Sequence, residues 1–335
     1  MEPIINLLIV LMFALAFGIG CNDETMATLV GSRAIKFKTA IIMAGSLAFV
    51  GVLFLSSSVG KTIGGNLLGE QVDYTRYMML AVIISTTIWL IVASKTGAPI
   101  STTHSVVGSV FGIAIVWSFQ AAGVFGESLN WSALGNVVLG WFISPVLGFM
   151  GAYLFQLGVT QYVKKQSTGL EQLEKTEKNF IYLLILAVSW TQISRGGNDS
   201  ANAIGILYGL IEVGDISGAN TTWYIIGTGI MLSAGIIIVG KNVIKNVGDN
   251  LIEMKPSDAF SIQISTSIVI FLATVLGLPV SGSHILIFAV IGAGRVKGEK
   301  PDKKSFRKMV ISWVVTFPAA AFLSAICYGI TLAIV

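Results

Sequence analysis

The residues from 97 to 104 read Gly-Ala-Pro-Ile-Ser-Thr-Thr-His, and those from 277 to 284 read Gly-Leu-Pro-Val-Ser-Gly-Ser-His. These stretches lie 180 positions apart and contain both histidines of the 335-residue chain. Two polar triplets upstream, Ser85-Thr86-Thr87 and Ser265-Thr266-Ser267, keep the same offset. Matched motifs at a constant spacing indicate an internal duplication.

The composition places this duplicated chain in a lipid bilayer. Hydrophobic residues make up 54% of the sequence and charged residues 11%, whereas a soluble domain carries about 25% charged residues. An ordinary water-soluble enzyme is therefore excluded. Cys21 and Cys327 lie in apolar stretches at opposite ends, so neither a disulfide framework nor a cysteine metal site is expected. Only Glu2 precedes the first apolar run, so no cleavable leader is expected either.

Windows of about 20 mostly apolar residues predict the membrane segments. There are ten of them, near residues 4–20, 39–57, 78–94, 100–118, 132–159, 180–194, 222–240, 261–278, 280–296 and 309–334. The fourth and the ninth begin almost where the preceding segment ends. Each of these close pairs is either two crossing helices or a re-entrant hairpin, so the prediction is about ten segments.

The basic residues give the orientation, because Lys and Arg collect in cytoplasmic loops. With the N-terminus outside, 18 of the 21 Lys and Arg lie in inside loops, and only Lys61, Arg76 and Arg195 are left for the other side. We therefore expect a multi-pass protein of the cell membrane with both termini external and a cytoplasmic helical linker at residues 161–179.

The linker separates two halves, a first repeat at residues 1–160 and a second at 180–335. Each half holds five windows, and an odd number of crossings inverts the second copy relative to the first. The predicted fold class is thus an all-α membrane protein with inverted repeats and some broken or re-entrant helices. Secondary transporters have this architecture, and their substrate sites lie near the midplane where the repeats meet.

An Asn-Asp pair opens each half of the chain. An acid at the centre of a bilayer costs at least about 2.5 to 3.5 kcal/mol, so such residues mark ion paths, relays or paired structural charges. Glycines beside both pairs would allow unwound backbone, whose carbonyls could join side-chain oxygens around a small hard cation. We predict sodium ligands at Asn22, Asp23, Asn198 and Asp199; an interfacial charge or a buried structural network is the alternative.

The two proline segments have the opposite polarity. Proline favours the first turn of a helix, and a helix N-terminus binds anions through its free N–H groups. Two such ends facing each other would hold a tetrahedral oxyanion, with donors from Ser101, Thr102, Thr103, Ser281, Gly282 and Ser283. Helix capping beside a proline turn is the simpler alternative. The two histidines, His104 and His284, either contact the substrate or are satisfied core residues.

Four motifs resemble those of the inorganic phosphate transporter family, which has a Gly-Ala-Asn-Asp-type signature and a Pro-x-Ser-Thr-Thr-His-type segment in each half. They are Gly196–Ala203, its looser version Cys21–Ala27, Pro99–His104 with its second copy, and Lys255–Phe260. The resemblance implies symport of phosphate with sodium or protons. It implies that the Asn-Asp pairs coordinate cation or phosphate and that the Ser/Thr segments bind phosphate. Met26 stands opposite Asn202, which predicts unequal cation sites.

Charge explains why a cation would be coupled. Each negative charge imported against an inside-negative potential costs about 2.3 kcal/mol per 100 mV, and two monovalent cations would cancel a dianion. The expected partners are inorganic phosphate, co-transported sodium or protons and the lipid bilayer, with no nucleic acid and no organic cofactor. A homodimer is expected by analogy with relatives.

Other functions were weighed against this one. A proton-coupled symporter of phosphate or sulfate fits the same motifs. An anion channel is disfavoured by the lack of Lys or Arg rings within the segments. An intramembrane enzyme is disfavoured because no His-Glu-x-x-His motif occurs and the Ser-His neighbours are symmetric. A structural scaffold would leave the duplicated polar clusters without a role.

Overall fold

The computed structural model describes residues 2–95, 101–120, 125–249, 254–299 and 303–334. These ranges form helices joined by turns, and the extended pairing in them is a single isolated bridge between Leu68 and Leu129. The helices of the first half are α1 Pro3–Gly20, α2 Ala27–Gly31, α3 Phe37–Lys61, α4 Arg76–Lys95, α5 Thr102–Gln120 and α6 Trp131–Gln166. Those of the second half are α7 Leu170–Glu212, α8 Thr221–Gly235, α9 Lys241–Asp249, α10 Pro256–Val275, α11 Gly282–Val296 and α12 Lys303–Ile334.

Each of the ten predicted windows falls on one long helix, and α2 and α9 are additional. Among the described residues, seven helical stretches are long and apolar enough to cross a membrane, and Arg76–Val92 in α4 and Gly282–Val296 in α11 are shorter apolar helices. The all-α membrane fold is therefore confirmed, whereas the number of crossings stays a prediction.

The segment expected as a separate linker is continuous with its neighbours. α6 runs on to Gln166 and α7 begins at Leu170, so that only a short turn separates them. Exposed charges suit this projecting helix, as the ion pair from Lys178 to Glu174 one turn earlier illustrates, at 2.8 Å. The predicted boundary at residue 180 consequently lies inside α7.

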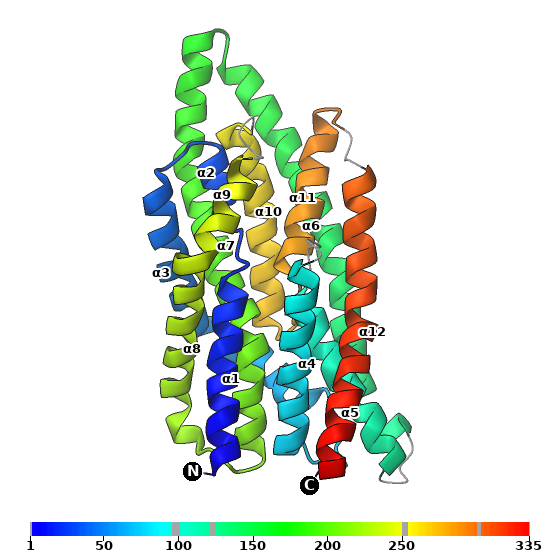
Figure 1. The fold of residues 1–335 in the computed structure, drawn as a ribbon. Coiled ribbons are helices and arrows are strands. Elements are labelled where there is room, and N and C mark those ends of the chain that lie inside the picture. The colour runs from blue at the N-terminus through cyan, green and yellow to red at the C-terminus, as the bar shows by residue number, and fades with distance from the viewer. Residues whose placement is uncertain (1, 96–100, 121–124, 250–253, 300–302, 335) are drawn as a thin grey trace.

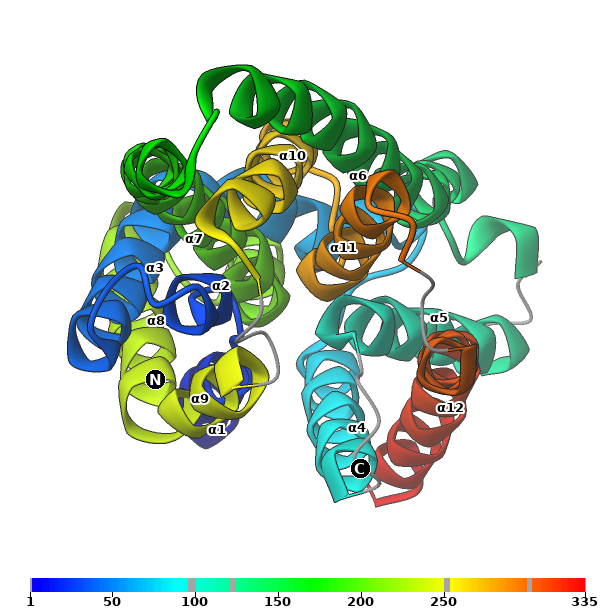
Figure 2. The same ribbon diagram turned by 90° about the horizontal axis from the view of Figure 1, so that it is seen from above.

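The helices pack in a way that agrees with a duplication. α3 packs on α7 and α1 on α8, while α6 covers α10 and α11, and α12 covers α4 and α5. When the five long helices of each half are matched in order, every one of these contacts has its counterpart. Figure 2 shows the two resulting three-helix groups, α4–α5–α12 and α6–α10–α11, next to each other. The last helix of each half therefore packs on the hairpin of the other half.

Local irregularities recur at matched places as well. A π-helical turn follows α3 at Thr62–Asn66 and another follows α8 at Ile236–Gly240. The last helix of each half contains a proline, Pro145 in α6 and Pro318 in α12. The repeat limits at residues 160 and 180 are not tested by these contacts and remain a prediction.

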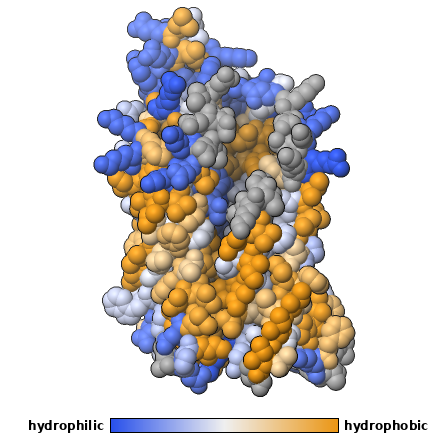
Figure 3. Space-filling model, viewed as in Figure 1, coloured by the Kyte–Doolittle hydropathy of each residue, from blue (hydrophilic) through white to orange (hydrophobic). Residues whose placement is uncertain are grey.

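Both termini lie at one end of the molecule, and the α6–α7 turn lies at the other (Figure 1). Between the ends, large apolar side chains such as Phe54, Phe142 and Phe322 face outward. Figure 3 shows this belt, with hydrophilic residues gathered beyond it at the end of the α6–α7 turn. In water such a surface would drive aggregation, so it fits a protein surrounded by lipid.

Candidate substrate and cation site

The first Asn-Asp pair lies in non-helical backbone, as expected. α1 ends at Gly20, and turns lead to α2 at Ala27. Asp23 is buried in this turn: its Oδ1 accepts the Thr25 N–H at 2.8 Å, and its Oδ2 accepts from Gln192 Nε2 at 2.8 Å. The Asn22 side-chain amide donates back to the Gly18 carbonyl, at 3.2 Å.

The second pair differs, because the unwound stretch expected at Gly196 and Gly197 is wrong. α7 continues as a helix through Gly196-Gly197 and Asn198-Asp199 to Glu212. The glycines are needed for close packing on α3: a Cβ at Gly196 would lie 2.6 Å from the Ala48 carbonyl oxygen, and one at Gly197 2.5 Å from the Leu55 Cβ. Helix–helix contact, and not backbone unwinding, explains these two residues.

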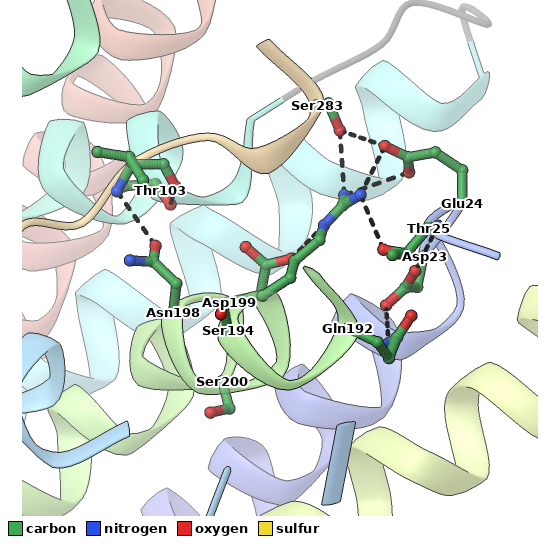
Figure 4. Close-up of polar contacts among 12 residues, drawn as sticks. Asp23, Glu24, Thr25, Thr103, Gln192, Ser194, Asn198, Asp199, Ser200 and Ser283 are labelled. Carbon is green, nitrogen blue, oxygen red and sulfur yellow. Dashed lines mark hydrogen bonds and ion pairs between the residues drawn. The ribbon is translucent and has the colours of Figure 1, made fainter. Parts of the chain in front are cut away.

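Asn198 fixes the turn between α10 and α11. Its Nδ2 donates to Thr274 Oγ1 and to the Leu278 carbonyl, both at 3.0 Å, and its Oδ1 accepts the Val280 N–H at 3.1 Å. The amide thus has partners on both sides in this conformation, and Figure 4 shows the bond at its oxygen. Asn198 positions the segment that leads into Ser281.

Arg195 is the centre of the polar cluster, and the sequence analysis misplaced it outside. It lies in α7 with 6% of its surface exposed. Its Nε donates to Asp199 Oδ2 at 2.9 Å, and its two terminal nitrogens donate to the Glu24 carboxylate at 2.8 and 3.2 Å. Further bonds reach Ser283 Oγ at 3.1 Å and Thr25 Oγ1 at 3.3 Å. Figure 4 shows Ser283, Glu24 and Thr25 gathered around the guanidinium.

A signal for Arg195 was present in the sequence. Arg195 and Asp199 are four residues apart, which places oppositely charged side chains on the same face of a helix. The positive-inside count treated the arginine as a loop residue, because it looked only at where basic residues fall along the chain. Within an apolar membrane segment, a basic residue with an acid one turn away is better explained as a buried pair.

The cluster has an excess of negative charge. Among the described residues it holds three carboxylates, Asp23, Glu24 and Asp199, and one guanidinium, and the other hydrogen-bonding partners found there are neutral: Thr25, Gln192 and Ser283. With every acid ionised, the net charge is about −2. A buried charge that has no counter-charge is costly, so this site favours cations.

The hydroxyl segments of the two halves meet beside this cluster. Ser101 caps α5, its Oγ accepting the His104 N–H at 3.3 Å. Thr103 Oγ1 donates to the Val280 carbonyl and accepts from Asn202 Nδ2, both at 3.3 Å. The start of α5 therefore touches both the α10–α11 turn and α7.

At the start of α11, the side chains approach the charges directly. Ser283 Oγ donates to Glu24 Oε1 at 2.7 Å. Gly282 takes the place that Thr102 has in the first copy, and a Cβ on it would lie 2.8 Å from Arg195 Nε. The glycine thus leaves room for the guanidinium, which explains a departure from the repeat that the sequence alone could not.

The histidines lie against aromatic rings instead of the charged cluster. The His104 ring is 3.9 Å from that of Trp141, the His284 ring is 3.7 Å from that of Trp313, and the two imidazoles are 5.0 Å apart. Both line an apolar cavity of about 530 Å³ between α6 and α12. Both rings pack in the core, but His104 Nδ1 and His284 Nε2 have no hydrogen-bond partner among the described residues. Neither sequence interpretation is therefore confirmed, and both stay predictions.

Four buried amide oxygens lack a donor among the described residues: Gln156 Oε1, which lies away from the cluster beside Asp258, and Gln192 Oε1, Gln263 Oε1 and Asn202 Oδ1. The last three are candidate ligands. Their amide nitrogens are engaged, by Asp23 for Gln192 and by Thr28 for Gln263. A buried acceptor without a partner costs about 1–3 kcal/mol, and amide oxygens are good ligands for hard cations. The two glutamines were missed by the sequence analysis, although each stands out as polar in an apolar window.

Comparisons with known proteins identify the family of this chain. A model of the phosphate transporter family matches residues 19–324. The chain is 30% identical to a probable low-affinity inorganic phosphate transporter of Bacillus subtilis, over 98% of this chain and 97% of that protein. It is 29% identical to a putative phosphate permease of Thermococcus kodakarensis, over 98% of each.

A solved structure described as the sodium-dependent phosphate transporter superposes with a TM-score of 0.84 and 25% identity, covering all of both chains. These relatives are transporters and permeases and not enzymes, which confirms the exclusion of an enzyme. With the matched region covering both halves and the signature motifs, this chain belongs to the phosphate transporter family.

Proposed function

We propose that the protein imports inorganic phosphate by sodium symport, with alternating access of one central site. The observation that carries the proposal is the meeting of hydroxyl segments from both halves beside a buried cluster with excess negative charge. Such a site repels phosphate when it is empty and attracts it once cations have bound. Cations therefore bind first.

Phosphate binds between the starts of α5 and α11. Its donors are the hydroxyls and N–H groups of these two helix ends: Ser101, Thr102, Thr103, Ser281, Gly282 and Ser283. His104 and His284 belong to the same segments and support the tips from the aromatic side. Two helix N-termini contribute partial positive charge, which favours an oxyanion there.

Sodium binds at the acids and the unpartnered oxygens. Asp23 and Asp199 supply carboxylates, and Asn22 and Asn198 belong to the same two motifs. Gln192, Gln263 and Asn202 add amide oxygens that accept no hydrogen bond from the described residues. Asn198 Oδ1 accepts the Val280 N–H, which leaves one lone pair of that oxygen for a sodium ion.

The carboxylates also favour phosphate over sulfate. At neutral pH phosphate keeps at least one P–OH group, which can donate to a carboxylate, whereas sulfate has only acceptors. Glu24 accepts a hydrogen bond from Ser283, one of the proposed phosphate donors. Asp199 accepts from Arg195, which also donates to Ser283. A buried acceptor facing an acceptor is costly, so we expect unlabelled sulfate to compete poorly with labelled phosphate.

The cellular arrangement belongs to the same proposal. Both termini face outward, the α6–α7 turn faces the cytoplasm, and the two repeats move relative to each other around the site. We also propose that the protein forms the homodimer expected from relatives.

Uptake of labelled phosphate into proteoliposomes tests the proposal, with sodium and pH varied separately at a clamped potential. We expect uptake to require an inward sodium gradient and Asp199→Asn to abolish it. Asp258→Asn is the matched control, because Asp258 is a buried acid paired with Lys297 outside the site. Full-rate uptake without sodium would contradict sodium coupling, and sulfate competing equally would contradict the selectivity.

A further inference from the structure

Arg195 has an unusual position for a site proposed to bind mobile cations. Its guanidinium contacts Glu24 from the first half and Asp199 from its own helix, and it uses all three nitrogens in doing so. The side chain is 7% exposed. An arginine in a protein keeps its charge at all physiological pH values, so this positive charge is permanent.

The surroundings are shaped to accept this side chain. Gly282 lies against the guanidinium, and any larger residue there would meet Arg195 Nε and Cδ at 2.8 and 3.0 Å. Matching the Asn-Asp pairs places Ile19 of the first half opposite Arg195. The fixed positive charge thus belongs to one half of the duplicated site, together with the glycine that accommodates it.

The charge of the site determines how many cations it needs. One buried carboxylate, Asp23, and two that are largely buried, Glu24 and Asp199, together have a charge of −3, and Arg195 reduces it to −2 without any ion from solution. Because net charge is costly in a desolvated site, each uncompensated carboxylate must be neutralised by a sodium ion or a proton. Arg195 does for one carboxylate what such a cation would do, but it is bonded to α7 and cannot cross the membrane.

On the proposed function, we propose that Arg195 is a built-in counter-cation that replaces one co-transported cation. Each phosphate then crosses with one positive charge fewer than the same site would carry without the arginine. Two other roles would give different results when the arginine is removed. Loss of a purely structural bridge would change stability only, and loss of a direct phosphate ligand would change phosphate affinity only.

The test is the net charge moved per phosphate, from the reversal potential of phosphate flux in proteoliposomes. This quantity counts sodium ions and protons together. We expect Arg195→Gln to raise it by one, Glu24→Gln to lower it by one, and the double variant to restore the wild-type value. Arg76→Gln is the matched control, since Arg76 is also paired with two acids, Glu2 and Asp215, but lies outside the site; it should leave the charge unchanged.

For variants that transport phosphate too slowly for a reversal potential, equilibrium binding of phosphate is measured instead. The slope of the logarithm of phosphate affinity against the logarithm of sodium concentration, at low sodium and fixed pH, gives the sodium ions taken up with phosphate. We expect a slope steeper by one for Arg195→Gln. If Arg195→Gln does not fold, Glu24→Gln can be compared with the double variant. Both lack one acid and they differ only in the arginine, so the slope should again be steeper by one in the variant without it.

The outcomes separate the two levels of the proposal. No phosphate uptake by the unaltered protein would contradict the proposed function itself. Uptake with unchanged charge and unchanged slope in Arg195→Gln would overturn only the built-in cation. Weaker phosphate binding at saturating sodium, with the slope unchanged, would assign Arg195 to phosphate and would overturn it too.

Discussion

At the scale of single residues, Gln192 offers the sharpest test of the proposed sodium site. It donates to Asp23, and its own oxygen is buried without a donor. Gln192→Leu removes a hydrogen bond to a carboxylate, worth about 1.5–3 kcal/mol. We expect the sodium concentration for half-maximal uptake to rise at least about tenfold. Sodium-dependence curves of phosphate uptake measure this directly.

Gln156→Leu is the matched control for that variant. Gln156 is also a buried glutamine in a membrane helix that donates to a carboxylate, Asp258 at 2.7 Å, and its oxygen also lacks a donor. It lies outside the charged cluster, so this variant should lower the melting temperature without shifting the sodium dependence. Equal shifts in both variants would mean that sodium affinity reports on stability and not on ligands.

The same scale shows what the sequence can reveal. Asp23 and the hydroxyl segments were found because their motifs occur twice along the sequence. Gln192 and Gln263 have no such copy, and their importance comes from side-chain contacts with residues over 70 positions away. Such contacts depend on how the helices pack, which a pattern along the chain does not contain.

At the scale of elements, the contact between α3 and α7 holds the site in place. A Cβ on Gly51 of α3 would collide with the Ile193 carbonyl, two residues before Arg195. Gly51→Ala should force the helices apart and destabilise the protein by about 1–3 kcal/mol or more. Gly158→Ala of α6 is the control: nothing lies within 4 Å of its Cβ position, and alanine is the better helix former.

Thermal unfolding in detergent, followed by intrinsic fluorescence, distinguishes the two glycines. We expect a lower midpoint for Gly51→Ala and an unchanged or higher one for Gly158→Ala, and equal midpoints would contradict the close packing of α3 on α7. The sequence predicted a segment inside each helix, at 39–57 for α3 and at 180–194 for α7, although α7 runs from Leu170 to Glu212. It could not tell the two glycines apart, and it took Gly196 for a point of unwinding, because only the neighbouring helix shows what a glycine is for.

At the scale of the whole molecule, the inverted repeat puts the α6–α7 turn and the termini at opposite ends. The end near the N-terminus also holds Arg76, which pairs with Glu2 and with Asp215 after α7. The charge count along the sequence gave the same arrangement even though it misplaced Arg195, because one buried arginine weighs little among 21 basic residues. Which end faces the cytoplasm follows from that count alone and can be tested.

Single cysteines at the two ends test the orientation. Thr168 lies exposed in the α6–α7 turn, and Ser217 lies exposed after α7, close to Asp215. In a background with Cys21 and Cys327 replaced by serine, a membrane-impermeant maleimide should label Ser217→Cys on intact cells and Thr168→Cys only after permeabilisation. The reverse labelling pattern would mean that the protein is inserted in the membrane with the opposite orientation. The charged cluster would stay as it is, but the excess of Lys and Arg at the turn end would then lie outside, against the rule that orients membrane proteins.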